Sequence, residues 1–390
     1  MTRSQVIMAS GQGIGTHRAA GISKTIFVIT IVVLGAISGV AGYYFGSGFK
    51  SGSSVISITG AGSTFAYPIF SAIAGNFSKF YPNIQVNYQS VGSGAGIADF
   101  QARTVDFGAT DAPLSTSQWT NITNTIGTPL HIPATIGSEA IAYNVPGITT
   151  GLKLNVTITA EIFQGNITKW NDPAIQDLNP TLSLPSNTIQ VVHRSDGSGT
   201  TFIFTSWLAR SSVWKQGASK SASVFPIGTG APGNEGVATL IQTTQYAIGY
   251  VELNYALSAS PPMTYAAVLN HDLNYVLPSL ATTAYAVSNS TATLPAGNGD
   301  WSNVNMLNAT GPQTYPIASF VYILVYQELS HIPNMNLATA EALVSFLYFT
   351  VINGQQLASG LSYVPLPQSV LTLDIATLSS VTFNSHALPP

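Results

Sequence analysis

Three short segments rich in glycine, serine and threonine carry the groups best suited to hold an anion. They are Gly60–Phe65 (GAGSTF), Gly92–Gly96 (GSGAG) and Asp196–Thr201 (DGSGTT), each between a strand-like and a helix-like pattern. A helix N-terminus exposes unpaired N–H groups and a partial positive charge. Glycine lets the backbone approach a ligand, and hydroxyls add donors. A turn and a helix cap explain any one segment alone, but three together favour an anion site.

The third segment also includes or adjoins two charged residues. Arg194 and Asp196 flank Ser195 at the end of the apolar strand pattern IQVVHR. Arginine is a permanently charged fork that suits tetrahedral oxyanions, and Asp196 can fix its orientation. The alternative is a surface ion pair of little energetic value. That alternative is less attractive in a chain of which only 7% is charged.

Asp111, in GATDAPLS, is the second charged residue of interest. An ionised carboxylate only accepts hydrogen bonds, so beside an anion it suits one that still carries a proton. Phosphate carries such a proton at ordinary pH and sulfate does not. The alternative is an aspartate that opens a turn before Pro113, and spacing alone favours that reading.

Composition excludes several classes of function. The 390 residues include 12 basic and 15 acidic ones, and four of the basic ones precede Ser51. The chain from Ser51 onward is therefore net negative, which disfavours nucleic acid as a partner. There is no cysteine, the six histidines show no ligand spacing, and no G-x-S-x-G motif occurs. We therefore predict no enzyme activity, no metal and no cofactor.

An uncharged apolar run, Thr25–Phe45, is long enough to cross a bilayer. Basic residues before it predict a cytoplasmic leader (1–24), a transmembrane anchor (25–45) and a Gly/Ser tether (46–54) with the rest of the chain outside the cell. A cleaved signal peptide is the alternative. The leader also resembles archaeal prepilin-type leaders, which implies a cut near Gly21–Ile22 that keeps the apolar run.

Six N-x-S/T sequons suit an exported glycoprotein. They are Asn76, Asn121, Asn155, Asn166, Asn289 and Asn308. From Val55 onward, β-rich runs alternate with helical patterns. This rhythm predicts an α/β fold with parallel strands.

Six motifs occur in an order that is highly specific. They are Thr59–Phe65, Asn87–Gly96, Val105–Ser115, Trp170–Pro180, Val191–Ala209 and Ala247–Glu252. Over Ile58–Pro367 the chain resembles the phosphate-binding protein of the phosphate ABC importer. The resemblance implies a two-lobed, type II periplasmic-binding-protein-like fold with a hinge. It also implies capture of inorganic phosphate between the lobes and delivery to the importer's permease subunits.

The resemblance also implies a ligand set and lobe boundaries. The implied phosphate ligands are Thr64, Phe65, Ser93, Asp111, Arg194, Ser198, Gly199 and Thr200, with Asp196 orienting Arg194. Phe65 and Gly199 would act through their backbone N–H groups. The implied lobes are 55–136 with 319–390, and 137–318, linked by hinge strands near ATIGSEAIAYN and YPIASFVYILV. Two alternatives stay open: a binding protein for another tetrahedral oxyanion, and a surface filament subunit.

Overall fold

The structure, a computed structural model, describes residues 55–290 and 294–389. The described residues belong to one compact unit, Ser53–Pro390. Three predicted segments lie outside them and stay predictions: the leader (1–24), the anchor (25–45) and the tether (46–54).

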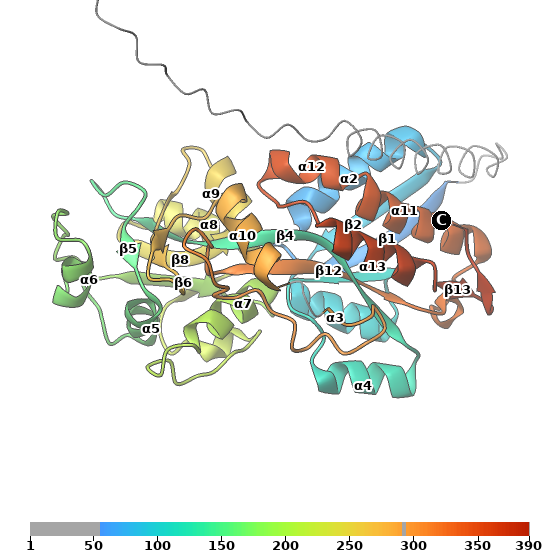
Figure 1. Ribbon diagram of the computed structural model, residues 1–390, viewed down its shortest axis with the longest axis horizontal. Helices are drawn as coiled ribbons and strands as arrows, with labels where there is room; N and C mark the ends of the chain where they lie inside the picture. Colours follow the sequence, from blue (N-terminus) through green and yellow to red (C-terminus); the bar gives the residue numbers. More distant parts are fainter. Residues whose placement is uncertain (1–54, 291–293, 390) are drawn as a thin grey trace, which may run out of the picture. The chain divides into compact units, whose positions relative to one another are not determined.

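A nine-stranded mixed sheet runs through this unit (Figure 1). In pairing order its strands are β2 (Ile84–Ser90), β1 (Ile56–Gly62), β3 (Phe107–Thr110), β12 (Ala318–Tyr326), β4 (Pro129–Asn144), β8 (Ala247–Glu252), β6 (Gln190–Arg194) and β7 (Thr229–Ala231), with β9 (Thr264–Tyr265) beside β4. The pairs β1–β2, β1–β3, β6–β8 and β6–β7 are parallel. The predicted α/β class with parallel strands is confirmed.

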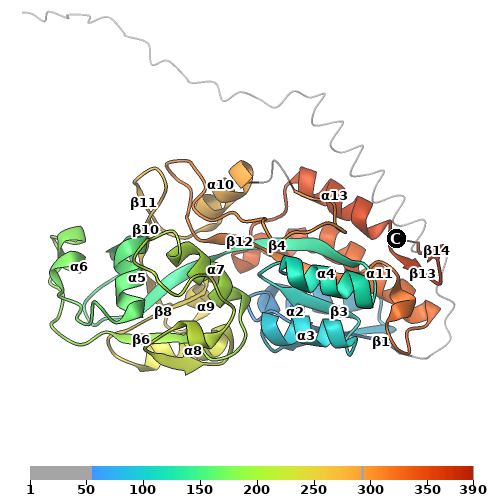
Figure 2. The ribbon, with the colours of Figure 1, turned by 90° about the horizontal axis from the view of Figure 1, so that it is seen from below.

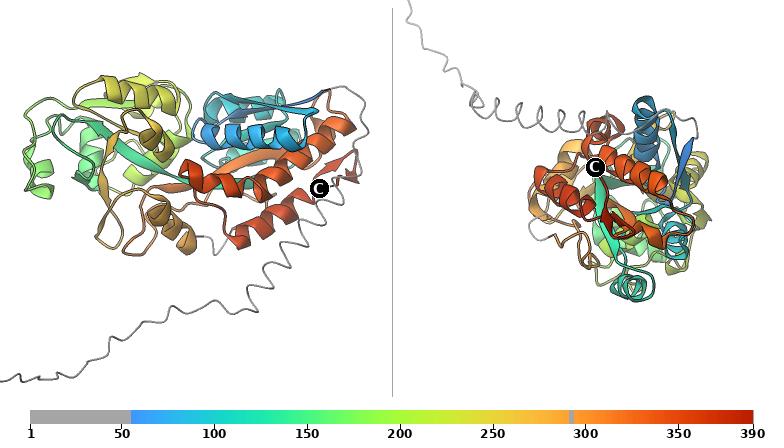
Figure 3. Two further views of the ribbon diagram at one scale, coloured as in Figure 1. Left: turned by 90° about the horizontal axis from the view of Figure 1, so that it is seen from above. Right: turned by 90° about the vertical axis from the view of Figure 1, so that its right-hand side faces the viewer.

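Strand β4 joins two groups of strands. Its first part, Pro129–Ser138, pairs antiparallel with β12, and its second part, Glu139–Asn144, pairs antiparallel with β8. One group is therefore β2-β1-β3-β12 and the other is β8-β6-β7 (Figure 3). The first segment predicted as a hinge lies within β4 and most of the second lies within β12, whereas the lobe boundaries stay a prediction.

Helices cover both faces of the first group. Helices α2 (Tyr67–Phe80) and α11 (Leu337–Ile352) pack on β2 and β1, and α3 (Ser93–Ala102) packs on β1 and β3 (Figure 2). The other helices around this group are α4 (Thr116–Thr125), η3 (Leu329–His331), α12 (Gln355–Ala358), η4 (Ser359–Leu361) and α13 (Gln368–Leu378), with the small sheet β13 (Thr382–Phe383) and β14 (His386–Ala387).

The second group has its own helices and a second small sheet. Helix α8 (Gly233–Thr243) packs on β6 and β8, and α7 (Gly199–Leu208) packs on β8. The remaining elements are α5 (Val156–Gln164), α6 (Pro173–Leu178), η1 (Ala222–Val224), α9 (Leu253–Ser258), α10 (Leu280–Ser290) and the strands β5 (Lys153–Leu154), β10 (Ala267–Leu269) and β11 (Tyr275–Val276).

In the described part of the chain, no single helix has both the length and the apolarity that a membrane crossing requires. Leu337–Ile352 and Gln355–Leu361 meet that test only together, as a pair bent by 52°.

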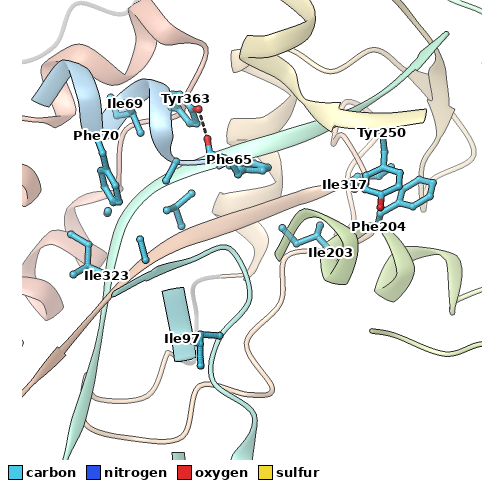
Figure 4. Packing of buried hydrophobic residues seen from close by; sticks show 14 of the residues in the cluster. Phe65, Ile69, Phe70, Ile97, Ile203, Phe204, Tyr250, Ile317, Ile323 and Tyr363 are labelled. Atoms are coloured by element: carbon cyan, nitrogen blue, oxygen red, sulfur yellow. Dashed lines mark hydrogen bonds between the residues drawn. The ribbon is translucent and has the colours of Figure 1, made fainter. Parts of the chain in front are cut away.

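Aromatic and aliphatic side chains form the core beneath the loops (Figure 4). Phe204 stacks on Tyr250 with ring centroids 4.3 Å apart, which fixes α7 against β8. Phe65 lies against Tyr363, whose hydroxyl donates to the Phe65 carbonyl oxygen at 2.6 Å. The loops thus stand on a rigid, buried base.

The first predicted loop is shorter than expected. Strand β1 continues to Gly62, and helix α2 begins at Tyr67 with Pro68 in its first turn, where a proline's missing N–H is tolerated. Gly62 has a φ of +143°, and a Cβ there would lie 2.0 Å from the Ala109 carbonyl oxygen. Glycine is therefore required because the strand passes so close to β3.

Candidate functional site

The loops after β1, β2, β3 and β6 meet at one place. Helix α3 starts at Ser93, and helix α7 starts at Gly199 with Ser198 as its N-cap. The Gly94 N–H donates to the Gly197 carbonyl oxygen at 2.8 Å, and a Cβ on Gly94 would lie 2.8 Å from the Gly197 Cα. Two of the three predicted segments therefore touch backbone to backbone, which only glycine allows.

Asp111 sits at the centre, with 1% of its surface exposed. The Ser63 hydroxyl donates to Oδ1, and the Ser93 hydroxyl lies 3.4 Å from Oδ2. A Cβ on Gly199 would lie 2.6 Å from Oδ2, so the start of α7 also approaches this carboxyl. Burial raises the pKa of Asp111 to about 6, while the Ser63 hydroxyl and the charge of Arg194 oppose that rise. At neutral pH Asp111 is mainly ionised.

Arg194 is as deeply buried as Asp111. Its guanidinium donates to Asp196 Oδ1 from Nε at 2.7 Å and to Oδ2 from Nη2. Nη1 donates to Thr200 Oγ1 at 3.2 Å. The predicted orienting role of Asp196 is therefore matched by a two-pronged contact. The guanidinium has five N–H donors in all, so two are left for a ligand.

Asn234, the second residue of α8, links both sides of the site. Its Nδ2 donates to Thr64 Oγ1 at 3.0 Å and to Thr200 Oγ1 at 3.1 Å. Its backbone N–H also donates to Thr64 Oγ1, at 3.2 Å. Each threonine oxygen thus accepts two N–H groups, so its own hydroxyl hydrogen must donate elsewhere. The network turns both hydroxyls into donors.

Three tyrosines orient the backbone of the first loop. The hydroxyls of Tyr88, Tyr255 and Tyr363 donate to three successive carbonyl oxygens, those of residues 63, 64 and 65, at 2.7, 2.8 and 2.6 Å. In a trans peptide the C=O and the following N–H point in opposite directions. The N–H groups of Thr64 and Phe65 therefore point away from the tyrosines and are free to meet a ligand.

Two further buried carboxyls lie on neighbouring strands of the nine-stranded sheet. Glu139 on β4 stands directly opposite Glu252 on β8, and both are fully buried. Glu252 accepts from the Asn254 N–H at 2.9 Å and caps α9, whereas neither Glu139 oxygen has a partner among the described residues. Burial and then the charge of Asp111 raise the pKa of Glu139 well above its usual value.

All nine predicted site residues lie in this connected arrangement, although their role as ligands stays a prediction. The sequence reasoning missed Ser63, Asn234 and the three tyrosines. Asn234 had a usable signal, because it lies in the glycine-containing segment APGNEG that opens a helix. Among the described residues, no group of three or more metal-ligating side chains is placed to hold a metal ion. The arrangement offers many donors around one carboxylate acceptor.

Comparison with known proteins gives the chain relatives. Residues 47–353 match the family model described as a PBP superfamily domain. The chain is 40% identical over 324 residues to the phosphate-binding protein PstS of Xylella fastidiosa, which covers 81% of this chain and 83% of that protein. It is 34% identical over 344 residues to PstS of Methanocaldococcus jannaschii, which covers 84% of this chain and 87% of that protein.

Solved structures share the fold. A high-affinity periplasmic phosphate-binding protein, PfluDING, determined with phosphate, has a TM-score of 0.67 and 21% identity, covering 82% of this chain and 93% of its own. A phosphate-bound, phosphate ABC transporter substrate-binding protein of Clostridium perfringens, described as putative, has a TM-score of 0.57 and 17% identity, covering 80% and 100%. At this identity the likeness concerns the fold alone.

Proposed function

Because the chain belongs to the PBP superfamily and, within it, to the PstS family of phosphate-binding proteins, we propose that it captures inorganic phosphate and delivers it to an ABC importer. The observation that carries the proposal is one buried carboxylate, Asp111, among hydroxyl, backbone and guanidinium donors. Its relatives are named phosphate-binding proteins, which supports a role as a binding protein rather than an enzyme.

The proposed anion site offers hydrogen-bond donors and positive charge to a tetrahedral anion from several directions. Arg194 supplies the positive charge, and the hydroxyls supply donors whose direction is set by Asn234. The first turn of α7 adds backbone N–H groups and a favourable dipole. The full set of proposed ligands is Thr64, Phe65, Ser93, Asp111, Arg194, Ser198, Gly199 and Thr200.

Asp111 gives the seat its selectivity. Phosphate near neutral pH keeps an O–H that can donate to the carboxylate, whereas sulfate would bring acceptor against acceptor. In a dry pocket an unpaired acceptor is costly, so the carboxylate rejects the wrong anion. We propose that the two strand groups close over the anion by bending along β4 and β12, as a ligand-driven population shift.

We also propose a location for the binding unit, on the basis of the N-terminal sequence. Residues 25–45 hold the chain in the membrane, 46–54 form the tether, and the unit from Val55 onward lies outside, where sequons carry glycans. This arrangement keeps the captured phosphate close to the permease. Neither the resemblance to prepilin leaders nor the apolar run explains the donor-lined site, so a filament subunit is the weaker candidate.

The direct test is calorimetric titration of the full-length chain with phosphate and with sulfate at pH 7.5. We expect one phosphate per chain and a preference over sulfate of about a hundredfold or more, since a buried unpaired acceptor costs roughly 2–3 kcal/mol. A folded protein that gives no heat with phosphate, or that binds sulfate equally well, would refute the proposed function.

A further inference from the structure

Lys220, in the segment between α7 and η1, reaches across from the second group of elements to the first. Its Nζ donates to the carbonyl oxygen of Pro113 at 3.2 Å, two residues after Asp111. The same Nζ lies 5.7 Å from the ring centroid of Phe202 on α7. The Lys220 carbonyl oxygen accepts from the Ser198 N–H at 2.9 Å. One residue therefore contacts the N-cap of α7 and the turn that follows Asp111.

The environment of this ammonium group is unusual for a lysine. Lysine is strongly hydrated, and withdrawing it from water is expensive without a charged partner. Among the described residues Lys220 forms no ion pair within 4 Å; its contacts there are a carbonyl oxygen and an aromatic ring. A cavity of about 290 Å³ borders Asp111, Pro113 and Phe202. The ammonium thus contacts Pro113 and Phe202, two residues that line this cavity together with Asp111.

The charge balance of the site leaves room for a second cation. Asp196 neutralises Arg194 through two contacts, while Asp111 is negative and a bound phosphate adds further negative charge. Two other described basic side chains are bound elsewhere: Lys215 donates to the Ser212 carbonyl oxygen within its own turn, and Arg210, which also lines the cavity, donates to the Leu307 carbonyl oxygen at 2.8 Å. Lys220, which bonds to the turn after Asp111, is a further cation whose charge interacts with that carboxyl.

We propose that Lys220 is a positioning residue of the phosphate site, whose ammonium stabilises the bound anion through space and whose bond to Pro113 holds the two groups of elements together. This inference rests on the proposed function. A positive charge close to an anion that is partly shielded from water attracts it more strongly than it would in bulk water. The hydrogen bond from Lys220 to Pro113 adds to this stabilisation, because it breaks when the two groups of elements separate.

The titration of Lys220 provides a signature that a purely structural role lacks. Burial lowers its pKa to about 8, and the charge of Asp111 opposes that decrease. The groups that face it are Asp111 after β3, Phe202 on α7 and His131 on β4, whose own pKa Lys220 helps to lower. His131 is neutral at pH 7 because its pKa lies at about 3. Between pH 7 and 9, Lys220 is therefore the group in this set that loses its charge.

The experiment compares four full-length proteins: wild type, Lys220→Met, Lys220→Arg and the control Lys215→Met. The control removes the same charge from the same segment without touching the cleft. Phosphate affinity is measured by calorimetry at pH 7 and pH 9, and phosphate dissociation by stopped flow. The melting temperature of each ligand-free protein reports whether it is folded.

At pH 7 we expect Lys220→Met to lose about tenfold in phosphate affinity, mainly through faster dissociation. Lys220→Arg keeps most of the affinity, and Lys215→Met stays within about twofold, as expected of an exposed charge. At pH 9 the gap between wild type and Lys220→Met closes, because wild type has then lost the charge too. Titration of phosphate itself affects all four proteins equally and cancels in these ratios.

The inference is overturned if Lys220→Met matches Lys215→Met at pH 7, or if the gap from wild type is the same at pH 7 and pH 9. Should Lys220→Met be unfolded, the pH 7 to 9 profiles of wild type and Lys220→Arg decide, since arginine stays charged. Equal profiles then refute the inference. A wild type that fails to bind phosphate contradicts the proposed function instead, so the two failures are distinguishable.

Discussion

Asp111 and Glu139 are both buried carboxyls in the same unit, yet they differ in their hydrogen-bond partners and in their charge. Asp111 receives hydroxyl donors, and its pKa of about 6 leaves it ionised at neutral pH. Glu139 has no hydrogen-bond partner among the described residues, and its pKa is raised well above the usual value by burial first and by Asp111 second. Burial alone therefore does not decide the charge of a carboxyl here; the donors around it do.

Asp111 and Glu139 therefore differ in whether the carboxyl itself carries a proton. Asp111 is held as an acceptor, so in the proposed complex with phosphate the proton of their shared hydrogen bond comes from the ligand. Glu139 must carry its own proton, because an uncompensated charge opposite Glu252 would be costly. The proposed anion site thus presents a defined pattern of hydrogen-bond donors and acceptors. The neighbouring sheet, in contrast, holds Glu139, a buried carboxyl without a hydrogen-bond partner among the described residues.

The largest change is expected when the cation that faces Asp111 is removed. Arg194→Ala should lower phosphate affinity by about a thousandfold or more, because it removes charge-assisted bonds and leaves the partly buried Asp196 without its partner. Calorimetry measures the loss. Arg103→Ala, which removes an exposed arginine bound to the His331 carbonyl oxygen, is the matched control and should bind as wild type does. Equal losses in the two variants would show that Arg194 is not part of the seat.

The facing glutamates Glu139 on β4 and Glu252 on β8 provide a second test of how surrounding donors affect a buried carboxyl. Glu139→Met should stabilise the protein at pH 8 by about 1–3 kcal/mol, since it removes a buried group without partners. Glu252→Met should destabilise it by about 1–2 kcal/mol, because that carboxyl caps α9. Chemical denaturation measures both. Changes of the same sign would contradict the assignment of partners.

The pH dependence of Glu139→Met has a defined sign. The folded-state pKa of Glu139 lies above its unfolded value, so the folded protein holds this proton more tightly. Its contribution to stability is therefore fully present below the unfolded pKa and is lost as the pH rises. The advantage of Glu139→Met over wild type should thus be greater at pH 8 than at pH 4. An advantage that does not change with pH would mean that Glu139 does not titrate on folding.

A smaller effect is expected at Asn234. Asn234→Ala removes the amide that donates to the Thr64 and Thr200 hydroxyl oxygens; if these hydroxyls are ligands as proposed, phosphate affinity should fall by about tenfold. Asn254→Ala removes an amide that donates to the Leu361 carbonyl oxygen outside the seat, and it serves as the control. Unchanged phosphate binding in Asn234→Ala would show that the threonines orient themselves without it.

Much of this arrangement was predictable because its signals are local. The β-loop-α rhythm predicted the α/β class, and the glycine segments together with Arg194 predicted an anion site. Asp111 entered that prediction only through the family resemblance, because its spacing alone favoured a turn before Pro113. The three tyrosines that orient the first loop were not predictable in this way, since Tyr363 and Phe65 are 298 positions apart. Such contacts depend on how strands β1, β2 and β8 are placed, and no short pattern records that placement.

Glu139 and the first loop show where local signals mislead. An acid within an apolar strand is visible in the sequence, but only the register opposite Glu252 reveals its burial without a partner. The segment GAGSTF reads as one loop, yet its glycines belong to β1 because the strand passes close to β3. In both cases the neighbour in the sheet, rather than the neighbour in the chain, decides the role.

The most direct test of the account is the anion selectivity of Asp111→Asn. The amide keeps the shape and supplies an N–H donor, so sulfate should bind more tightly and the phosphate-over-sulfate ratio should fall by about tenfold or more at pH 7.5. Acid should act on wild type in the same direction, with sulfate binding more tightly as the pH falls through about 6, the pKa of Asp111. Asp106→Asn, whose carboxyl accepts from Thr59, is the control and should keep the wild-type ratio. If Asp111→Asn rejects sulfate as firmly as wild type does, Asp111 does not read the proton of the ligand and the central claim is wrong.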